Sequence, residues 1–433
     1  MKSIAMIILG LGMALSVAAR EGTLLSDQGS GRATAYLESP KIVTFEGKTH
    51  VAWLDSSEEG FRVCIRSLDR ESGIWSERYT IGEAEDNHGG PALTVDAEGY
   101  LHVIYYAHHH PVRYRKSVRP NDASQWSEYI PFGRDLTYPA LLCAPDGTLV
   151  LAARRSYEDK PWELEMWRKE PDGDWERQGA VLRSRHGIYA QFAASLAWGA
   201  DRRTLHLATR IYELPEDELE QPLTTVGYLK SEDGGRSWSR SDGAPVSLPA
   251  TAETLDVIAS GRGREGRILN AGSLAIGPDG LPYVPYSVRT EDSSQAYLAR
   301  PYGNGKWRHR HLNPYLPEEV RDWALFMHGG VAFGEAGQPV VTAVAMQVEP
   351  LAPDWGDPSS EAVCFRSEDG GESFAGNLLG RIDPETPSWM PNMERPTGFN
   401  EMGAYPSFVY TVGARGDSLS DRLSNEVWWV PTE

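Results

Sequence analysis

DNHGGPALTVDAEGYLHVIYYAHHHPVRYRKSVRP, residues 86–120, contains the unit that decides the fold. Two alternating apolar runs, Ala92–Val95 and Leu101–Tyr106, flank a turn with an aspartate and a glycine, and together they predict one antiparallel β-hairpin. His88 precedes the first strand and His108 follows the second. Because these two positions lie at the same edge of an antiparallel pair, we expect the histidines to lie close together.

The same pattern of strand, turn and strand recurs along the chain. Further copies begin near residues 39, 137, 188, 270 and 328, and a weaker copy begins near residue 404. An outer pair of strands follows each hairpin and often ends near a tryptophan, as at Trp75, Trp126, Trp175, Trp238 and Trp307. This repeat predicts an all-β fold, a seven-bladed β-propeller with four-stranded antiparallel blades. Two Asp-box-like segments, 231–238 and 367–374, are expected to be structural turns without catalytic carboxylates.

The N-terminal residues predict export. Residues 1–19 combine Lys2, an apolar run and small residues before Arg20, which is typical of a secretory signal peptide. An uncleaved anchor is the alternative, but the apolar run is short for a membrane span. We therefore expect a secreted or periplasmic protein without a membrane partner. Residues 20–433 are expected to form a single propeller domain, and the protein is expected to be a monomer.

Charge and cysteine content narrow the classes of function. Because the net charge is −19, we do not expect a nucleic-acid partner. An anionic substrate would need a local basic patch. Three cysteines, Cys64, Cys143 and Cys364, lie in apolar runs and are interpreted as buried thiols. No spacing of histidines or cysteines resembles a zinc site, so no metal or other cofactor is predicted, although a structural calcium or zinc ion is left open.

Propeller geometry brings the ends of every inner hairpin to one ring around the central channel. The residues at these positions are mainly His, Tyr and Arg, with few carboxylates. They are Ser39, His88 with Gly89, Tyr138, Tyr189, Asn270, His328 and Tyr405 at strand starts, and Asp55, His108 to His110, Arg154 with Arg155, Arg210 and Arg289 at strand ends. An ordinary glycoside hydrolase needs two carboxylates across the scissile bond, and the ring offers no obvious pair. A β-eliminating lyase instead needs a cation against a uronate carboxylate, a base and an acid, which Arg, His and Tyr can supply.

The stretch from Asn87 to Ser117 resembles the signature of secreted seven-bladed propeller polysaccharide lyases, above all the ulvan lyases and their relatives that cleave rhamnose–glucuronate linkages. The wider group is that of the BNR-repeat proteins. This resemblance implies a lyase acting on an anionic, uronate-containing polysaccharide. It implies active-site roles for His88, His108, Tyr138, Arg154 and Tyr189. Arg154 would neutralise the uronate carboxylate, while the histidines and tyrosines would share the acid and base roles in an order that the sequence leaves open.

Further candidates for substrate binding are His206, Arg210, Arg113 and His328. Strand alternation sends one of Arg154 and Arg155 toward the channel and the other away, and the resemblance favours Arg154. Two alternative functions stay open, an α-L-rhamnosidase-like hydrolase on the same propeller and a carbohydrate-binding propeller without catalysis.

Overall fold

The computed structural model of the chain describes residues 22–187, 189–215, 222–262, 267–290, 293–347, 356–380, 382–383 and 386–431. The signal peptide predicted for residues 1–19 lies outside these ranges. Strands dominate the described residues, and the helical elements named among them are two short 3₁₀ turns, η2 (Asn313–Tyr315) and η3 (Glu318–Val320). In the described part of the chain, no helix has the length and hydropathy needed to cross a membrane.

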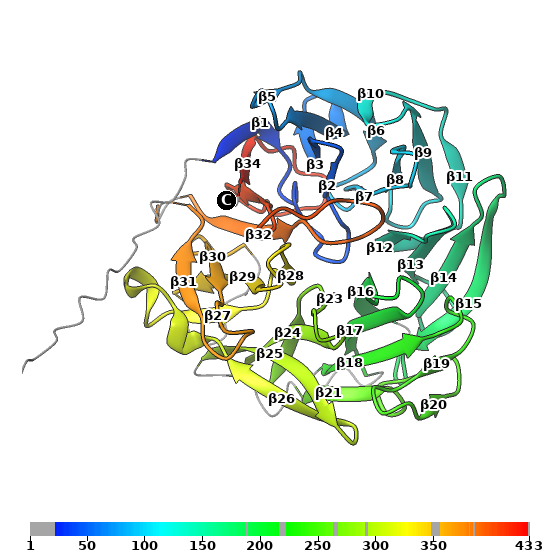
Figure 1. Cartoon of the computed structure of the whole chain (residues 1–433), viewed down its shortest axis with the longest axis vertical. Helices are drawn as coiled ribbons and strands as arrows, with labels where there is room; N and C mark the ends of the chain where they lie inside the picture. The colour runs from blue at the N-terminus through cyan, green and yellow to red at the C-terminus, as the bar shows by residue number, and fades with distance from the viewer. Residues whose placement is uncertain are drawn as a thin grey trace, which may run out of the picture.

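Antiparallel sheets surround a common centre, which confirms the predicted all-β propeller (Figure 1). Five sheets are separate blades of four to six strands. The first two of them comprise β7 (Ala92–Val95), β8 (Leu101–Tyr105), β9 (Val112–Arg119), β10 (Asp122–Trp126) and β11 (Ile130–Phe132), then β12 (Leu136–Cys143), β13 (Leu149–Arg155), β14 (Glu163–Lys169) and β15 (Trp175–Arg183). The next blade comprises β16 (Ala190–Trp198), β17 (Leu205–Glu213), β18 (Leu223–Ser231), β19 (Trp238–Ser239), β20 (Pro245–Val246) and β21 (Asp256–Arg262).

Two more separate blades complete this part of the ring. One comprises β22 (Ile268–Ala271), β23 (Ala275–Ile276), β24 (Pro282–Arg289), β25 (Ser294–Gly303) and β26 (Lys306–His311). The other comprises β27 (Ala324–Phe326), β28 (Val331–Phe333), β29 (Pro339–Met346), β30 (Glu361–Arg366) and β31 (Ala375–Leu378).

The expectation of seven blades was wrong, because the structure has five blades and the strands of the first and last repeats join in one larger sheet. Their strands form one nine-stranded sheet, which comprises β1 (Thr23–Gly29), β2 (Ile42–Phe45), β3 (Lys48–Ser57), β4 (Gly60–Asp69), β5 (Ile74–Trp75), β6 (Tyr79–Ala84), β32 (Ser388–Met393), β33 (Phe408–Val412) and β34 (Asn425–Val430). The strand β1 pairs with β34 from Thr23 to Gly29 and meets β3 where Gly29 faces Asp55. The ring is therefore closed by backbone hydrogen bonds between the two ends of the described chain.

Apolar side chains fill the space between neighbouring blades. One buried cluster joins Ala92 and Ile104 of the β7–β8 hairpin to Leu141 and Leu151 of the β12–β13 hairpin. The strand β29 is buried along its whole length, as its continuous apolar sequence predicts. The three cysteines are buried and free, which confirms their interpretation as thiols.

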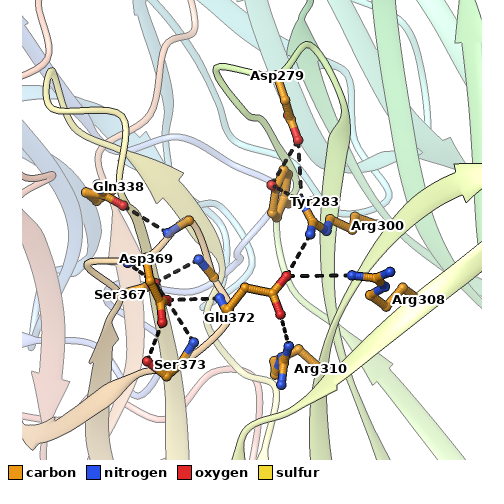
Figure 2. A network of polar contacts seen from close by, with 12 residues as sticks. Asp279, Tyr283, Arg300, Arg308, Arg310, Gln338, Ser367, Asp369, Glu372 and Ser373 are labelled. Carbon is orange, nitrogen blue, oxygen red and sulfur yellow. Dashed lines mark hydrogen bonds and ion pairs between the residues drawn. The ribbon is translucent and has the colours of Figure 1, made fainter.

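The Asp-box turn of residues 367–374 shows how one blade is attached to the next (Figure 2). Asp369 accepts hydrogen bonds from the backbone N–H and hydroxyl of Ser373 and from the N–H of Glu372, and these bonds lower the pKa of Asp369 to about 2. From this turn, the carboxylate of Glu372 reaches Arg300 on β25 and Arg308 and Arg310 on β26. The turn thus holds Glu372 in a contact between two blades.

Candidate functional site

The β7–β8 hairpin brings the two predicted histidines together. The rings of His88 and His108 stack with their centroids 3.9 Å apart, so the proximity predicted from the hairpin is confirmed. One carboxylate holds both rings. Asp86 lies 3.3 Å from Nδ1 of His88 through Oδ1 and 2.5 Å from Nδ1 of His108 through Oδ2. Although burial opposes the effect, these hydrogen bonds hold the pKa of Asp86 well below its usual range.

His88 is engaged on both sides of its ring. Its Nε2 lies 2.6 Å from Nη1 of Arg32, and a guanidinium can only donate, so this nitrogen accepts and the ring proton lies on Nδ1 facing Asp86. Burial lowers the pKa of His88 to about 4, and the nearby Arg32 charge acts in the same direction. At neutral pH His88 is therefore an uncharged ring with a fixed orientation.

His108 differs from His88 in one respect that matters for proton transfer. Its Nδ1 donates to Asp86, and no hydrogen bond joins its Nε2 to another of the described residues. The backbone of His108 has a φ of 102°, in the left-handed region that side chains other than glycine rarely adopt. Tyr138 also has a positive φ, of 59°. Strained backbone of this kind tends to gather at functional sites, where the surrounding fold supports it.

A continuous line of rings and cations connects these histidines to the other candidates. Tyr36 stacks on His88 with centroids 5.5 Å apart and packs against Tyr138 at 4.6 Å. The guanidinium carbon of Arg154 lies 4.6 Å from the ring centroid of Tyr138 and 4.6 Å from that of Trp162. Trp162 in turn packs on Tyr189 at 4.7 Å. The structure thus gathers the five residues predicted to be catalytic into one cluster.

Arg154 is a buried cation held between aromatic faces. Its side chain is 2% exposed, its Nε is buried without a hydrogen bond, and no ion pair joins it to a carboxylate of the described residues. Its neighbour Arg155 turns to the other side, toward Glu165 at 3.8 Å. The register that the sequence left open is therefore resolved, with Arg154 facing the cluster. A buried guanidinium without a carboxylate partner is suited to bind an anionic ligand.

A cavity of about 310 Å³ lies beside this cluster at the centre of the ring. It is lined by residues from the β1–β2 connection and from six further segments, namely Arg32, Tyr36, Leu37, Glu38, Tyr138, Gln191, Ala193, Arg210, Asn270, Ala271, Met327, His328 and Met390. Arg210 donates to Asn270 Oδ1 at 2.9 Å and to Gln191 Oε1 at 2.7 Å, and Gln191 donates to the hydroxyl of Tyr189 at 2.6 Å. The predicted convergence of Tyr138, Arg210, Asn270 and His328 at the central channel is confirmed by this lining.

Two candidates lie elsewhere. His206 pairs with Ala197 at the turn end of the β16–β17 hairpin, where its Nδ1 meets the hydroxyl of Tyr228 at 2.6 Å, so the expectation that it binds substrate does not fit its place in the fold. Arg113 on β9 stacks on Tyr106 at 3.7 Å and contacts neither the histidine pair nor Arg154.

Sequence reasoning missed Asp86, Arg32, Tyr36, Trp162 and Glu38. Asp86 stands two residues before His88 in the quoted stretch, and an acidic residue so close to a candidate histidine was a usable signal. Arg32 and Tyr36 lie in the connection between β1 and β2, outside every repeat, and only ring closure brings them to the site.

The donor atoms of Asp86, His88 and His108 lie within 4.8 Å of one another, a group that could hold a metal ion by composition. The donors already bind one another, and the guanidinium of Arg32 beside Nε2 of His88 would repel a cation. The arrangement fits proton transfer better than metal binding.

Comparison with known proteins identifies relatives of this chain. The BNR repeat-containing family matches residues 48–314, more than half of the chain. A protein named ulvan lyase PL25 from Pseudoalteromonas sp. (strain PLSV) is 27% identical over 171 residues, which are 33% of this chain and 34% of that protein. An ulvan lyase from Nonlabens ulvanivorans is 21% identical over 393 residues, 81% of this chain and 78% of that one.

A solved structure supports the fold. The PL25 ulvan lyase bound to -[GlcA(1-4)Rha3S]- superposes with a TM-score of 0.72 at 16% identity, over 95% of this chain and 96% of that chain. At this identity the likeness establishes a common fold. The chain spans about a third of the Pseudoalteromonas relative in the sequence alignment.

Proposed function

Because the chain belongs to the BNR repeat-containing family, we propose that it is a polysaccharide lyase that cleaves a uronate-containing, rhamnose-linked glycan of the ulvan type by β-elimination. The observation that carries this proposal is Arg154, a buried guanidinium with aromatic faces on two sides and no carboxylate partner among the described residues. The ulvan lyases among its relatives support the substrate class.

Arg154 performs the electrostatic part of the reaction. Removing the C5 proton of a uronate adds negative charge next to an existing carboxylate, so the reaction is slow without a compensating cation. A guanidinium binds a carboxylate through two parallel hydrogen bonds and stabilises the charge that develops in the transition state. The surrounding rings exclude water, which strengthens this interaction.

Proton transfer is assigned to the residues that flank Arg154. His108 accepts the C5 proton on its open Nε2, and Asp86 stabilises the resulting imidazolium through Nδ1. The electron pair of the C5–H bond forms the C4=C5 double bond while the C4–O4 bond breaks. Burial raises the pKa of Tyr138, so its hydroxyl is protonated and can donate to the departing O4. His88, uncharged and bound to Arg32 and Asp86, acts as a positioning residue.

The hydrolase alternative receives less support. A two-carboxylate mechanism needs an acid and a second carboxylate facing one bond. Glu38 is the one carboxylate among the described residues that line the cavity. Both oxygens of Asp86 are hydrogen-bonded to the two histidines.

The test is ultraviolet absorbance during incubation of the purified protein with ulvan, because β-elimination creates an unsaturated uronate that absorbs. We expect absorbance to rise for the natural sequence and to stay flat for Arg154→Ala and His108→Ala. Arg155→Ala is the matched control, because this neighbouring arginine faces Glu165 instead of the cluster. Release of reducing sugar without absorbance would assign the protein to the hydrolases, and binding without turnover would make it a carbohydrate-binding propeller.

We also propose that residues 1–19 direct export and that residues 20–433 form a single secreted catalytic domain. A polymeric substrate outside the cell agrees with this. Mass spectrometry of the N-terminus of the exported protein tests it, with cleavage before Arg20 expected.

A further inference from the structure

A groove of about 480 Å³ lies at the outer edge of the blade that carries Arg154. The last strand of that blade, β15, forms one wall, and the other wall comes from the next blade, from its Asp-box turn and from Leu248 with Pro249 (Figure 1). A parallel bridge between Leu182 and Ala250 joins the two walls. This rim groove shares no lining residue with the central cavity, so it is a separate feature of the surface.

Positive charge gathers in the rim groove, although the chain as a whole has a net charge of −19. The charged residues of its lining are one carboxylate and four cations, namely Glu163, Lys160, Arg177, Arg183 and Arg236. The buried Glu163 forms ion pairs with three of the cations, Lys160, Arg177 and Arg183. Even when the second partner of Arg177, Glu165, is counted as well, the four cations exceed the two carboxylates by two.

These cations keep donors that an anionic ligand can reach. The side chains of Lys160, Arg177 and Arg183 are 43%, 41% and 43% exposed. Arg236 donates to the backbone carbonyl of Asp233 at 3.3 Å and pairs with no carboxylate of the described residues. Ammonium and guanidinium groups in such positions bind carboxylates and sulfates through charge-assisted hydrogen bonds. A cleft lined mainly by one sign of charge also attracts an oppositely charged polymer against the net charge of the protein.

The loop between β13 and β14 connects the rim groove to the catalytic cluster. Trp162 packs on Arg154 and Tyr189 at the end of this loop, and Lys160, two residues earlier, lines the groove. The indole N–H of Trp162 donates to the carbonyl of Tyr157 at 2.9 Å, and Nζ of Lys160 lies 3.8 Å from the ring centroid of Tyr157. A polysaccharide with its uronate at Arg154 can therefore pass over Trp162 and continue along the surface into the groove.

We propose that the rim groove is a distal binding site for an anionic segment of the polysaccharide, whose carboxylate and sulfate groups bind Lys160, Arg177, Arg183 and Arg236. The inference rests on the proposed function for the identity of the polysaccharide. The apolar surface of Met166, Val181 and Leu248 packs against sugar C–H groups in the same groove. A chain held at two connected sites gains affinity that a short fragment cannot gain, so long chains bind more tightly than short ones.

The test measures affinity, so that it does not depend on turnover. Long ulvan chains and a uronate–rhamnose disaccharide, which is too short to cover both sites, are titrated by calorimetry into the His108→Ala protein. We expect the additional pair Lys160→Gln and Arg236→Gln to weaken the binding of long chains by about tenfold and to leave disaccharide binding unchanged. The matched control is Lys306→Gln with Arg321→Gln, which removes the same charge from two exposed residues outside the groove.

A second variant guards against an effect on folding. Gln178→Glu adds a carboxylate to the lining of the groove without removing an ion pair, and it should weaken the binding of long chains as well. An affinity for long chains that equals that of the control in both variants would overturn the inference. An equal loss for long chains and disaccharide would also overturn it, because the groove would then not be distal.

The outcome for the groove can be separated from the outcome for the lyase proposal. Failure of the lyase proposal would appear as an absence of ultraviolet absorbance when the natural sequence is incubated with ulvan. In that case dextran sulfate, a polyanion without uronate, replaces ulvan in the titrations. Weaker binding of dextran sulfate by the groove variants than by the control would support the groove, and equal binding would overturn it.

Discussion

The Nδ1 atom of His108 lies 2.5 Å from Oδ2 of Asp86, and the second oxygen of the same carboxylate faces Nδ1 of His88. One aspartate thereby sets the tautomer of two stacked imidazoles and directs the Nε2 atoms of both rings away from itself. This arrangement has a direct consequence for the proton-transfer step.

Replacing the shared aspartate should slow the reaction without abolishing substrate binding. We expect Asp86→Asn to lower kcat by about 10²-fold, because an imidazolium on His108 loses its counter-charge, while KM changes little. Steady-state ultraviolet assays measure both values. The control is Asp96→Asn, which removes an equivalent contact to His102 at the turn end of the same hairpin. An equal loss of kcat in both variants would assign Asp86 to the stability of the hairpin instead.

Arg154 should not tolerate a conservative replacement. Lysine keeps the charge but lacks the planar fork that binds a carboxylate through two hydrogen bonds and stacks on Tyr138 and Trp162. We expect Arg154→Lys to reduce kcat/KM by about 10²-fold, a loss of roughly 3 kcal/mol of transition-state stabilisation. An activity near that of the natural sequence would show that a point charge is sufficient.

Buried histidines should make the protein sensitive to acid. Burial lowers the pKa of His50 and of His206 to about 4, whereas an unfolded histidine titrates near 6.5. Between these values the unfolded state binds more protons, so the free energy of unfolding decreases as the pH falls from about 6.5 to 4. Each residue contributes about 2 to 3 kcal/mol to this decrease between pH 7 and 4.5.

Urea unfolding at the two pH values measures this decrease. His206→Gln, which keeps a partner for Tyr228 but does not titrate, should show a smaller decrease than the natural sequence by about the contribution of one histidine. The same decrease in both proteins would mean that His206 does not contribute.

Removal of the last strand should prevent cooperative folding. Deleting residues 425–433 eliminates β34, which pairs with both β33 and β1 and buries Val427 and Trp429 in the core. We expect the shortened chain to show no sharp thermal transition by circular dichroism. A chain that lacks residues 432 and 433 alone keeps β34 and should melt as before. A sharp transition in the shorter chain would show that closure of the ring is dispensable.

Local patterns in the sequence predicted most of the architecture and half of the site. The hairpin at 86–120 has period two and a turn signal, and this information was sufficient to place His88 beside His108. The repeat likewise placed Tyr138 and Arg154. Arg32, Tyr36 and Glu38 were not predictable in this way, because they reach the site through a connection without periodicity. The number of separate blades depended on long-range pairing of β1 with β3 and β34, which no local pattern encodes.

The pairing of β1 with β34 also determines when the site can form during synthesis and folding. Arg32 and Tyr36 follow β1 directly, and the strand that anchors them is paired with nearly the last residues of the described chain. A ribosome must finish this partner strand before the first one can dock against it. The site is therefore completed late, because a prematurely terminated chain would contain Arg32 but lack the partner strand of β1, the strand that directly precedes Arg32 and helps to hold it beside His88.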